Sequence, residues 1–186
     1  KALDEGKSSD EITNNGLTAA MTDIGEDFGS GRMFLPQVLL SAETMRAAFD
    51  KIKELIPASA EATKGTVVLA TVKGDVHDLG KNIVGALMAN SGFKVIDLGK
   101  DIAPEEIVEA VLREKADICG LAALMTTTMP QIDKTVAALH AKKSTAKVMI
   151  GGAAVTADYV EISGADCYAG DAVHAVRLAK EMLGID

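Results

Sequence analysis

The chain has 186 residues, a formal net charge of −8 and a sequence pI near 4.9. Its basic residues form no run and it has no tryptophan, so it has neither the basic face nor the aromatic platform of a nucleic-acid binder. No apolar stretch reaches membrane-spanning length, and no secretory leader is visible. We therefore expect a soluble, cytoplasmic protein with no nucleic-acid and no membrane partner.

The first 60 residues predict helices. One helix is expected to start at Ser9–Ile12, with periodic apolar positions at Leu17, Met21 and Ile24 before Gly25. A turn at Gly29–Gly31 follows. Pro36 lies where the next helix begins, at a position that needs no amide hydrogen. That helix has a broad apolar stripe, formed by Val38, Leu39, Ala42, Met45, Ala48, Phe49, Ile52, Leu55 and Ile56. We expect a bundle of four helices, of which these two are the best marked.

Strand and helix patterns alternate after a small, polar linker, Pro57–Gly65. Five units of this kind predict a flavodoxin- or Rossmann-like parallel sheet in the order 2-1-3-4-5, with helices on both faces. The expected domains are residues 1–60 and 65–186. The expected strands are residues 66–72, 94–98, 117–122, 147–150 and 167–169, and the expected helices are residues 81–91, 104–115, 129–142, 156–163 and 172–183.

A histidine lies where the first strand passes into its helix. Open α/β sheets bind ligands at the carboxyl ends of their strands, at the switch point between strands one and three. The loops after those strands, residues 73–80 and 124–129, should therefore converge. Asp75 can orient the ring of His77, and Gly80 allows a bulky group to approach the backbone. The pattern Asp-x-His-x-x-Gly thus indicates a metal cofactor whose metal is held only in part by the protein.

Two other interpretations of this loop fail. A phosphate-binding P-loop needs four residues between its glycines and then Lys-Ser/Thr, but five residues separate Gly74 from Gly80, and Asn82 replaces the hydroxyl residue. A structural zinc site needs about four ligands, and the other histidines, His140 and His174, lie in helical patterns far along the chain.

The two cysteines, Cys119 and Cys167, fall in strand-like apolar runs. They are predicted to be small buried side chains, without a disulfide or a CxxC site. His77 alone cannot hold zinc, but it can supply one axial ligand to a metal that arrives in a macrocycle.

Three elements in order resemble the signature of cobalamin-binding domains: Asp75-x-His77-x-x-Gly80, Ala122-x-Leu124 forty-five residues after the histidine, and Gly151-Gly152. The segment Gly25–Val38 is similar to the helical cap that precedes this domain in cobalamin-dependent methionine synthase and in the corrinoid proteins of anaerobic methyltransferase systems. The resemblance covers nearly the whole chain. It implies an N-terminal all-α cap followed by the α/β domain.

The resemblance also implies how cobalamin is bound: base-off and His-on, with His77 as the lower cobalt ligand and Asp75 as partner of the other ring nitrogen. Asp75 and His77 would be the catalytic residues, and methylcobalamin the loaded state. Phe28, Leu35 and Val38 would cover the upper face of the corrin, with the linker as a hinge. The remaining cofactor-binding residues would be Asp78, Gly80, Ala122, Leu124, Thr126, Thr128, Gly151, Gly152, Tyr168 and Ala169.

One position departs from the family pattern. Where the family has serine, this chain has Ala122, so the usual Asp-His-Ser chain loses its hydroxyl end. Thr126 and Thr128 match residues that contact the corrin or its tail in the family, and on this basis they are not expected to repair the relay.

By this resemblance the chain is a corrinoid methyl carrier, a component of a methyltransferase system and not a complete enzyme alone. It would take a methyl group from a substrate-specific methyltransferase and deliver it to an acceptor methyltransferase that uses tetrahydrofolate, a tetrahydropterin or a thiol, with a reductive activator for cobalt(II). The donor could be methanol, a methylamine, an aryl methyl ether or a betaine. Three alternatives remain: the cobalamin subunit of an adenosylcobalamin mutase, a cobalamin-dependent sensor, and a flavodoxin-like domain without cobalamin.

Overall fold

The structure, a computed structural model, describes residues 5–7, 12, 16–17, 19–53 and 63–185. It divides into two compact units, Lys1–Ala62 and Thr63–Asp186. None of the described helices is both long and apolar enough to cross a membrane.

The first unit contains two described helices that pack on each other, α2 (Ala19–Gly29) and α3 (Leu35–Lys53). Met21 of α2 is buried, and the buried stripe of α3 is formed by Val38, Ala42 and Met45 at helical spacing, as the sequence pattern predicted. The expected helix start at residues 9–11 and the linker residues 57–62 lie outside the described residues.

The α2 helix includes Gly25 and continues to Gly29, since a glycine inside a helix costs only about 1 kcal/mol relative to alanine. The chain turns at residues 29–31, as expected, and Gly31 supplies the positive φ of 76° that this turn needs. Arg32 then returns to α2 through an ion pair with Asp27.

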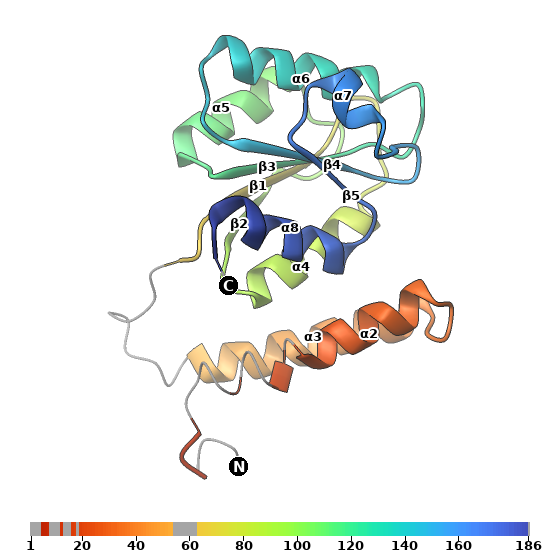
Figure 1. Cartoon of the computed structure of the whole chain (residues 1–186), viewed down its shortest axis with the longest axis vertical. Coiled ribbons are helices and arrows are strands. Elements are labelled where there is room, and N and C mark those ends of the chain that lie inside the picture. The colour runs from red at the N-terminus through yellow and green to blue at the C-terminus, as the bar shows by residue number, and fades with distance from the viewer. Residues whose placement is uncertain (1–4, 8–11, 13–15, 18, 54–62, 186) are drawn as a thin grey trace. The chain divides into compact units, whose positions relative to one another are not determined.

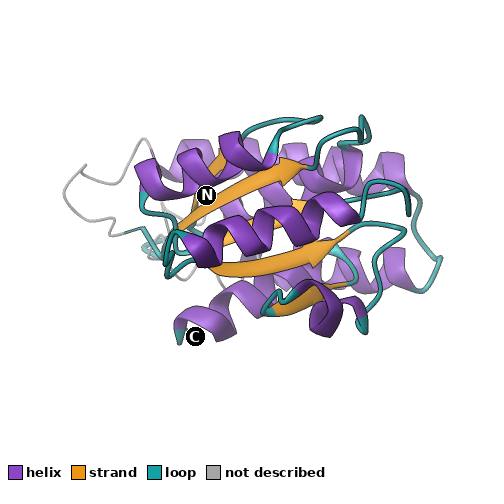
Figure 2. Cartoon of the chain, turned by 90° about the horizontal axis from the view of Figure 1, so that it is seen from above, coloured by secondary structure: helices purple, strands orange, loops and turns teal. Residues whose placement is uncertain are grey.

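The second unit is built on a five-stranded parallel sheet in the order β2-β1-β3-β4-β5, which confirms the predicted order. In Figure 2 the strands point the same way, and the loops that follow them gather along one edge of the sheet. The strands are β1 (Thr66–Thr71), β2 (Lys94–Asp97), β3 (Ile118–Ala122), β4 (Lys147–Gly151) and β5 (Cys167–Ala169).

Helices cover both faces of this sheet (Figure 1), so the inner residues of its central strands are apolar and buried. On one face α4 (Leu79–Asn90) and α8 (Ala172–Leu183) pack beside each other over Val67, Leu69 and Ile118. On the other face lie α5 (Pro104–Glu114), α6 (Pro130–Ala141) and α7 (Tyr159–Ser163). The described part of the chain thus has the helical region and the α/β sheet that the sequence predicted.

Two helix starts differ from the sequence pattern. The α4 helix begins at Leu79, two residues earlier than expected. Leu79 and Gly80 adopt helical geometry, but they lie outside the apolar periodicity from which the start of the helix was predicted. The α7 helix begins at Tyr159 and not at residue 156, because residues 156–158 form turns in which the amides of Tyr159 and Val160 bond to Thr156 and Ala157.

Candidate functional site

His77 and Asp75 are held together at the carboxyl end of β1. Nδ1 of His77 lies 2.8 Å from Oδ1 of Asp75, and the same oxygen accepts the amide hydrogen of His77 at 3.1 Å. The Asp75 side chain is fully buried, whereas 51% of the His77 side chain is exposed. The predicted contact between the carboxylate and the imidazole is therefore present, and Nε2 is the ring nitrogen left for a ligand.

The second oxygen of Asp75 joins this loop to the loop after β3. Oδ2 accepts the amide hydrogen of Leu124 at 2.7 Å and the hydroxyl hydrogen of Thr128 at 2.9 Å. The predicted convergence of the two loops at the switch point is thus confirmed. Every polar contact of this buried carboxylate is made by a hydrogen donor, which is the arrangement that an ionised carboxylate requires.

The charge state of Asp75 follows from these contacts. Burial by itself raises the pKa of the Asp75 carboxyl, but the hydrogen bonds from Leu124, His77 and Thr128 outweigh burial and lower this pKa from 3.8 to about 2. At neutral pH the carboxylate can only accept hydrogen bonds, so Nδ1 of His77 must carry a hydrogen. This fixes the tautomer in which Nε2 offers its lone pair.

The expectation that Thr128 has no part in the relay was wrong. Its hydroxyl is buried and donates a hydrogen bond to Oδ2 of Asp75. The hydroxyl also lies 2.8 Å from the carbonyl oxygen of Met125, so it has two acceptors for its single hydrogen. The family pattern did not reveal the contact between Thr128 and Asp75, because the two residues are 53 positions apart in the sequence.

Small residues form a row across the ends of four strands. Thr71, Ala122, Gly151 and Ala169 are partners in the register of β1, β3, β4 and β5. Residues in register point to the same face of a sheet, and Ala169 packs with the apolar cluster on the α4 and α8 side. A Cβ atom on Gly151 would lie 2.9 Å from the carbonyl oxygen of Ala169, so the row is closely packed there.

Gly152 permits a second close approach. Its φ is 113°, and a Cβ atom there would lie 2.2 Å from the carbonyl oxygen of Ala123. Only glycine fits both the backbone conformation and the contact. By contrast, a Cβ atom on Gly80, in the first turn of α4, would have no neighbour within 4 Å, so the space beside it is open.

The other predicted site residues of this unit surround this edge of the sheet. Asp78 precedes α4 and lies 3.9 Å from Lys100, without a capping hydrogen bond. Thr126 is exposed and Leu124 is half-buried in the loop after β3, and Tyr168 is half-buried in β5. Val76 and Leu79, which flank the His77 loop, are large apolar side chains with exposures of 60% and 47%.

The helical unit holds the remaining predicted residues. Phe28, at the end of α2, is 41% exposed, Leu35 is half-buried, and Val38 is 5% exposed. Their role as a cover for a ligand stays a prediction, because the two units are described separately.

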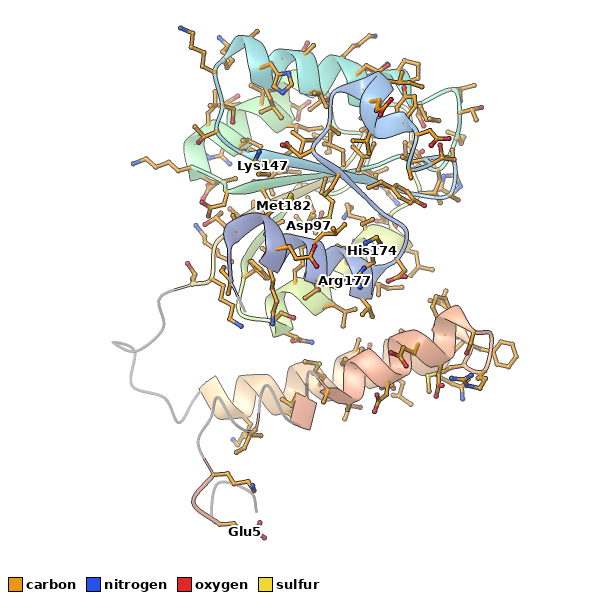
Figure 3. The ribbon with its side chains drawn as sticks, in the orientation of Figure 1. Glu5, Asp97, Lys147, His174, Arg177 and Met182 are labelled. Carbon is orange, nitrogen blue, oxygen red and sulfur yellow. The ribbon has the colours of Figure 1, made fainter. Side chains whose placement is uncertain are left out.

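Neither of the other histidines belongs to this site. His140 is exposed on α6, and His174, labelled in Figure 3, lies on α8, where its Nδ1 accepts the amide hydrogen of Gly170. Among the described residues, no group of three His, Cys, Asp or Glu side chains could hold a metal ion. Both cysteines are free, as expected, but only Cys119 is buried as predicted, and Cys167 is half-buried. Burial raises the pKa of the Cys119 thiol to about 12.

Sequence reasoning missed two supports of the His77 loop. The Thr71 hydroxyl donates a hydrogen bond to the carbonyl oxygen of His77 at 3.0 Å. The buried ammonium of Lys81 pairs with Asp97 at the end of β2, labelled in Figure 3, and so ties the first turn of α4 to the sheet. A threonine at a strand end and a lysine in a helical pattern are too common to be selected by sequence alone.

The sequence comparisons agree with this geometry. Residues 65–179 match a family described as a B12 binding domain, and residues 1–53 match a second family with the same description. The chain is 43% identical to dimethylamine corrinoid protein 1 of Methanosarcina acetivorans over 176 residues, which cover 93% of this chain and 83% of that protein.

Solved structures give the same result. A cobalamin-binding protein from Desulfitobacterium hafniense is 35% identical, with a TM-score of 0.80 over 89% of this chain and 78% of that chain. The methanol:cobalamin methyltransferase complex from Methanosarcina barkeri contains a chain that is 35% identical, with a TM-score of 0.78 over 94% of this chain and 67% of that one. This chain therefore belongs to the corrinoid proteins that are built on the B12 binding domain.

Proposed function

We propose that this corrinoid protein binds its cofactor base-off and His-on, with Nε2 of His77 as the lower ligand of cobalt. The observation that carries the proposal is the fixed tautomer of His77: Asp75 accepts the hydrogen on Nδ1, and half of the ring is exposed. An imidazole nitrogen suits cobalt, and a carboxylate on the opposite nitrogen raises the basicity of the ligand.

The residues around His77 fit a large, mostly apolar macrocycle that brings its own ligands. One imidazole is enough for a metal whose other ligands come with the cofactor. The exposed apolar side chains of Val76 and Leu79 provide surface beside the ring of His77. The row of Ala122, Gly151 and Ala169, with open space at Gly80, supports a path for the displaced nucleotide tail along the α4 and α8 side of the sheet.

The proposed activity is methyl transport between two partner enzymes. When bound, the corrinoid supplies a cobalt centre that accepts a methyl group and later gives it up. The chain's own residues hold Nε2 toward the metal and, when His77 is released, the pair of His77 and Asp75 offers a place for a proton at Nε2. A substrate-specific methyltransferase, an acceptor methyltransferase and a reductive activator would act in trans.

We propose a methylamine as the source of the methyl group. This rests on the curated relatives, which are dimethylamine and trimethylamine corrinoid proteins at 40% to 43% identity. The structure named for methanol is 35% identical. In a reconstituted assay, methyl transfer to this protein should be faster from a methylamine methyltransferase than from a methanol methyltransferase. A higher rate with methanol would reject the choice of donor while leaving the carrier function intact.

Electron paramagnetic resonance tests the binding mode. The protein is loaded with hydroxocobalamin, reduced to cobalt(II) and compared with a sample in which histidine carries nitrogen-15. If a histidine is the ligand, the nitrogen-15 label changes the splitting of the cobalt(II) signal from three lines to two. If the cofactor's own base is the ligand, its unlabelled nitrogen keeps three lines. The His140→Ala variant, which changes an exposed histidine on α6, should keep the two-line pattern. Three lines in the labelled wild-type protein would exclude His77 as the ligand.

A further inference from the structure

Asp101 has a left-handed backbone conformation, although it does not lie at the end of a helix. It lies in the loop between β2 and α5 and has a φ of 59°, in the left-handed region that L-residues seldom adopt. The other described non-glycine residues with positive φ are Lys115, which caps the end of α5, and Lys143, which follows the end of α6. Such residues commonly end helices, but Asp101 precedes a helix.

The conformation lets Asp101 hold the turn that precedes His77. Its backbone amide donates to the carbonyl oxygen of Asp75 at 3.0 Å, and its carboxylate accepts the amide hydrogen of Gly74 at 2.8 Å. The same carboxylate oxygen lies 3.2 Å from the ammonium of Lys73. One residue therefore contacts three consecutive residues of the loop.

The turn held in this way sets the direction of Asp75. The amide of Asp75 bonds to Val72, which pairs with Ile102 next to Asp101. Gly74 has a φ of 83°, so the turn depends on a conformation that few residues other than glycine adopt. Asp75 is thus held from two directions. The β2–α5 loop contacts its backbone, and Leu124 and Thr128 contact its side chain.

We propose that Asp101 is a positioning residue of the corrinoid site. It fixes the backbone of Gly74 and Asp75 and, through them, the orientation of the His77 ring. This inference rests on the proposed function, because His77 has to be the cobalt ligand for its orientation to matter. The ionised state that the carboxylate needs is favoured by the Gly74 amide and by Lys73, which lower the pKa of Asp101.

Asp166 provides a matched control at the opposite edge of the sheet. It also accepts a backbone amide hydrogen, from Val148 at 2.7 Å, and pairs with Lys147, labelled in Figure 3, at 2.8 Å. Asp166 thus makes the same two kinds of contact as Asp101, but at the amino end of β4, away from His77. A general effect of losing such a carboxylate should appear in both variants.

The test uses the full chain with three variants. Asp101→Gly removes the carboxylate without adding strain, because glycine tolerates positive φ. Asp101→Asn keeps an acceptor for the Gly74 amide and loses the ion pair, and Asp166→Asn is the control. Cobalamin affinity and the fraction of His-on cobalt(II) are measured, together with the ring-nitrogen shifts of His77 in the cofactor-free protein.

We expect Asp101→Gly to weaken cobalamin binding about threefold to tenfold, to lower the His-on fraction and to shift the His77 resonances, with a smaller effect for Asp101→Asn. The control should match the wild type in all three. The proposal is overturned if Asp101→Gly leaves the His77 resonances and the His-on fraction unchanged, or if Asp166→Asn alters them equally. If Asp101→Gly does not fold, Asp101→Asn decides by the same criteria. A wild-type protein without His-on cobalt would instead reject the proposed function.

Discussion

The two units of this protein hold their candidate residues by different physical means. In the α/β unit, Asp75 is fully buried and receives hydrogen bonds from three other residues, so that His77 has a defined tautomer. In the helical unit, the candidate residues Phe28 and Val38 are apolar side chains, and they are 41% and 5% exposed. Hydrogen bonds specify direction, whereas apolar burial is non-directional. Substitutions in the α/β unit should therefore change ligation, and those in the helical unit should change only protection of the cofactor.

The largest expected effect is that of His77→Ala. Because the ligand itself is removed, we expect complete loss of histidine nitrogen coupling to cobalt(II) and about a 100-fold loss of corrinoid affinity, the upper end of the range for changes around metal ligands. Spectroscopic titration and electron paramagnetic resonance measure both. The matching change His140→Ala should have no effect, and an unchanged His77→Ala spectrum would show that His77 is not the ligand.

Gly152→Ala should be the most destabilising change at the edge of the sheet. Its new Cβ atom would lie 2.2 Å from the backbone oxygen of Ala123, at a φ of 113°. We expect a loss of about 3 kcal/mol in the free energy of unfolding, measured by urea denaturation. Gly184→Ala separates the two causes, because Gly184 also has positive φ but open space around it. Equal losses in both variants would show that the contact with Ala123 is not the cause.

Asp75→Asn should impair ligation without removing the ligand. An asparagine has one acceptor oxygen, so its amide group would face a hydrogen donor, either His77 or Leu124. We expect corrinoid affinity to fall about tenfold to 100-fold, as measured by spectroscopic titration. Wild-type affinity in this variant would remove Asp75 from the site.

The same variant gives a prediction for pH. The pKa of Asp75 is lowered from 3.8 to about 2, so its contribution to stability is present above pH 3.8 and is lost as the pH falls toward 2. This contribution is about 2 kcal/mol. The difference in unfolding free energy between the wild type and Asp75→Asn should therefore shrink between pH 5 and pH 2. A constant difference would contradict the lowered pKa.

Thr128→Val tests the hydrogen bond between Thr128 and Asp75. Valine keeps the shape and loses the hydroxyl, so Oδ2 of Asp75 keeps the amide of Leu124 and loses the hydroxyl of Thr128. We expect affinity to fall about threefold to tenfold, with Thr128→Ser close to the wild type. Thr135→Val, at a buried threonine that bonds within α6, is the control.

Phe28→Ala should have the smallest effect and should leave ligation unchanged. If Phe28 covers the upper face of the corrin, photolysis of bound methylcobalamin should become faster. Phe34→Ala is the comparison, because Phe34 is 72% exposed in the same unit. Equal photolysis rates for Phe28→Ala and the wild type would contradict the covering role and would leave the cofactor protected by other means.

Much of this protein follows from its sequence because the relevant signals are local. Apolar runs and helical spacing predicted the five strands, and a parallel sheet of five strands favoured the flavodoxin-like order that the structure shows. Asp75 was matched to His77 because the two lie within one loop. The domain limits and the covering role of Leu35 and Val38 stay predictions.

Tertiary structure decided the contacts that cross between loops. Thr128 reaches Asp75 across 53 residues, and Asp101 reaches Gly74 across 27. The sequence alone determined which loop carries Asp75 and His77, because periodicity and turn residues act over a few positions. It did not determine which hydroxyl or carboxylate completes the site, because distance in space between two loops depends on the register of the strands that carry them. Ala122 is an example. The alanine at this position predicted that Asp75 has no hydroxyl partner, whereas in the folded chain the hydroxyl of Thr128 bonds to Asp75.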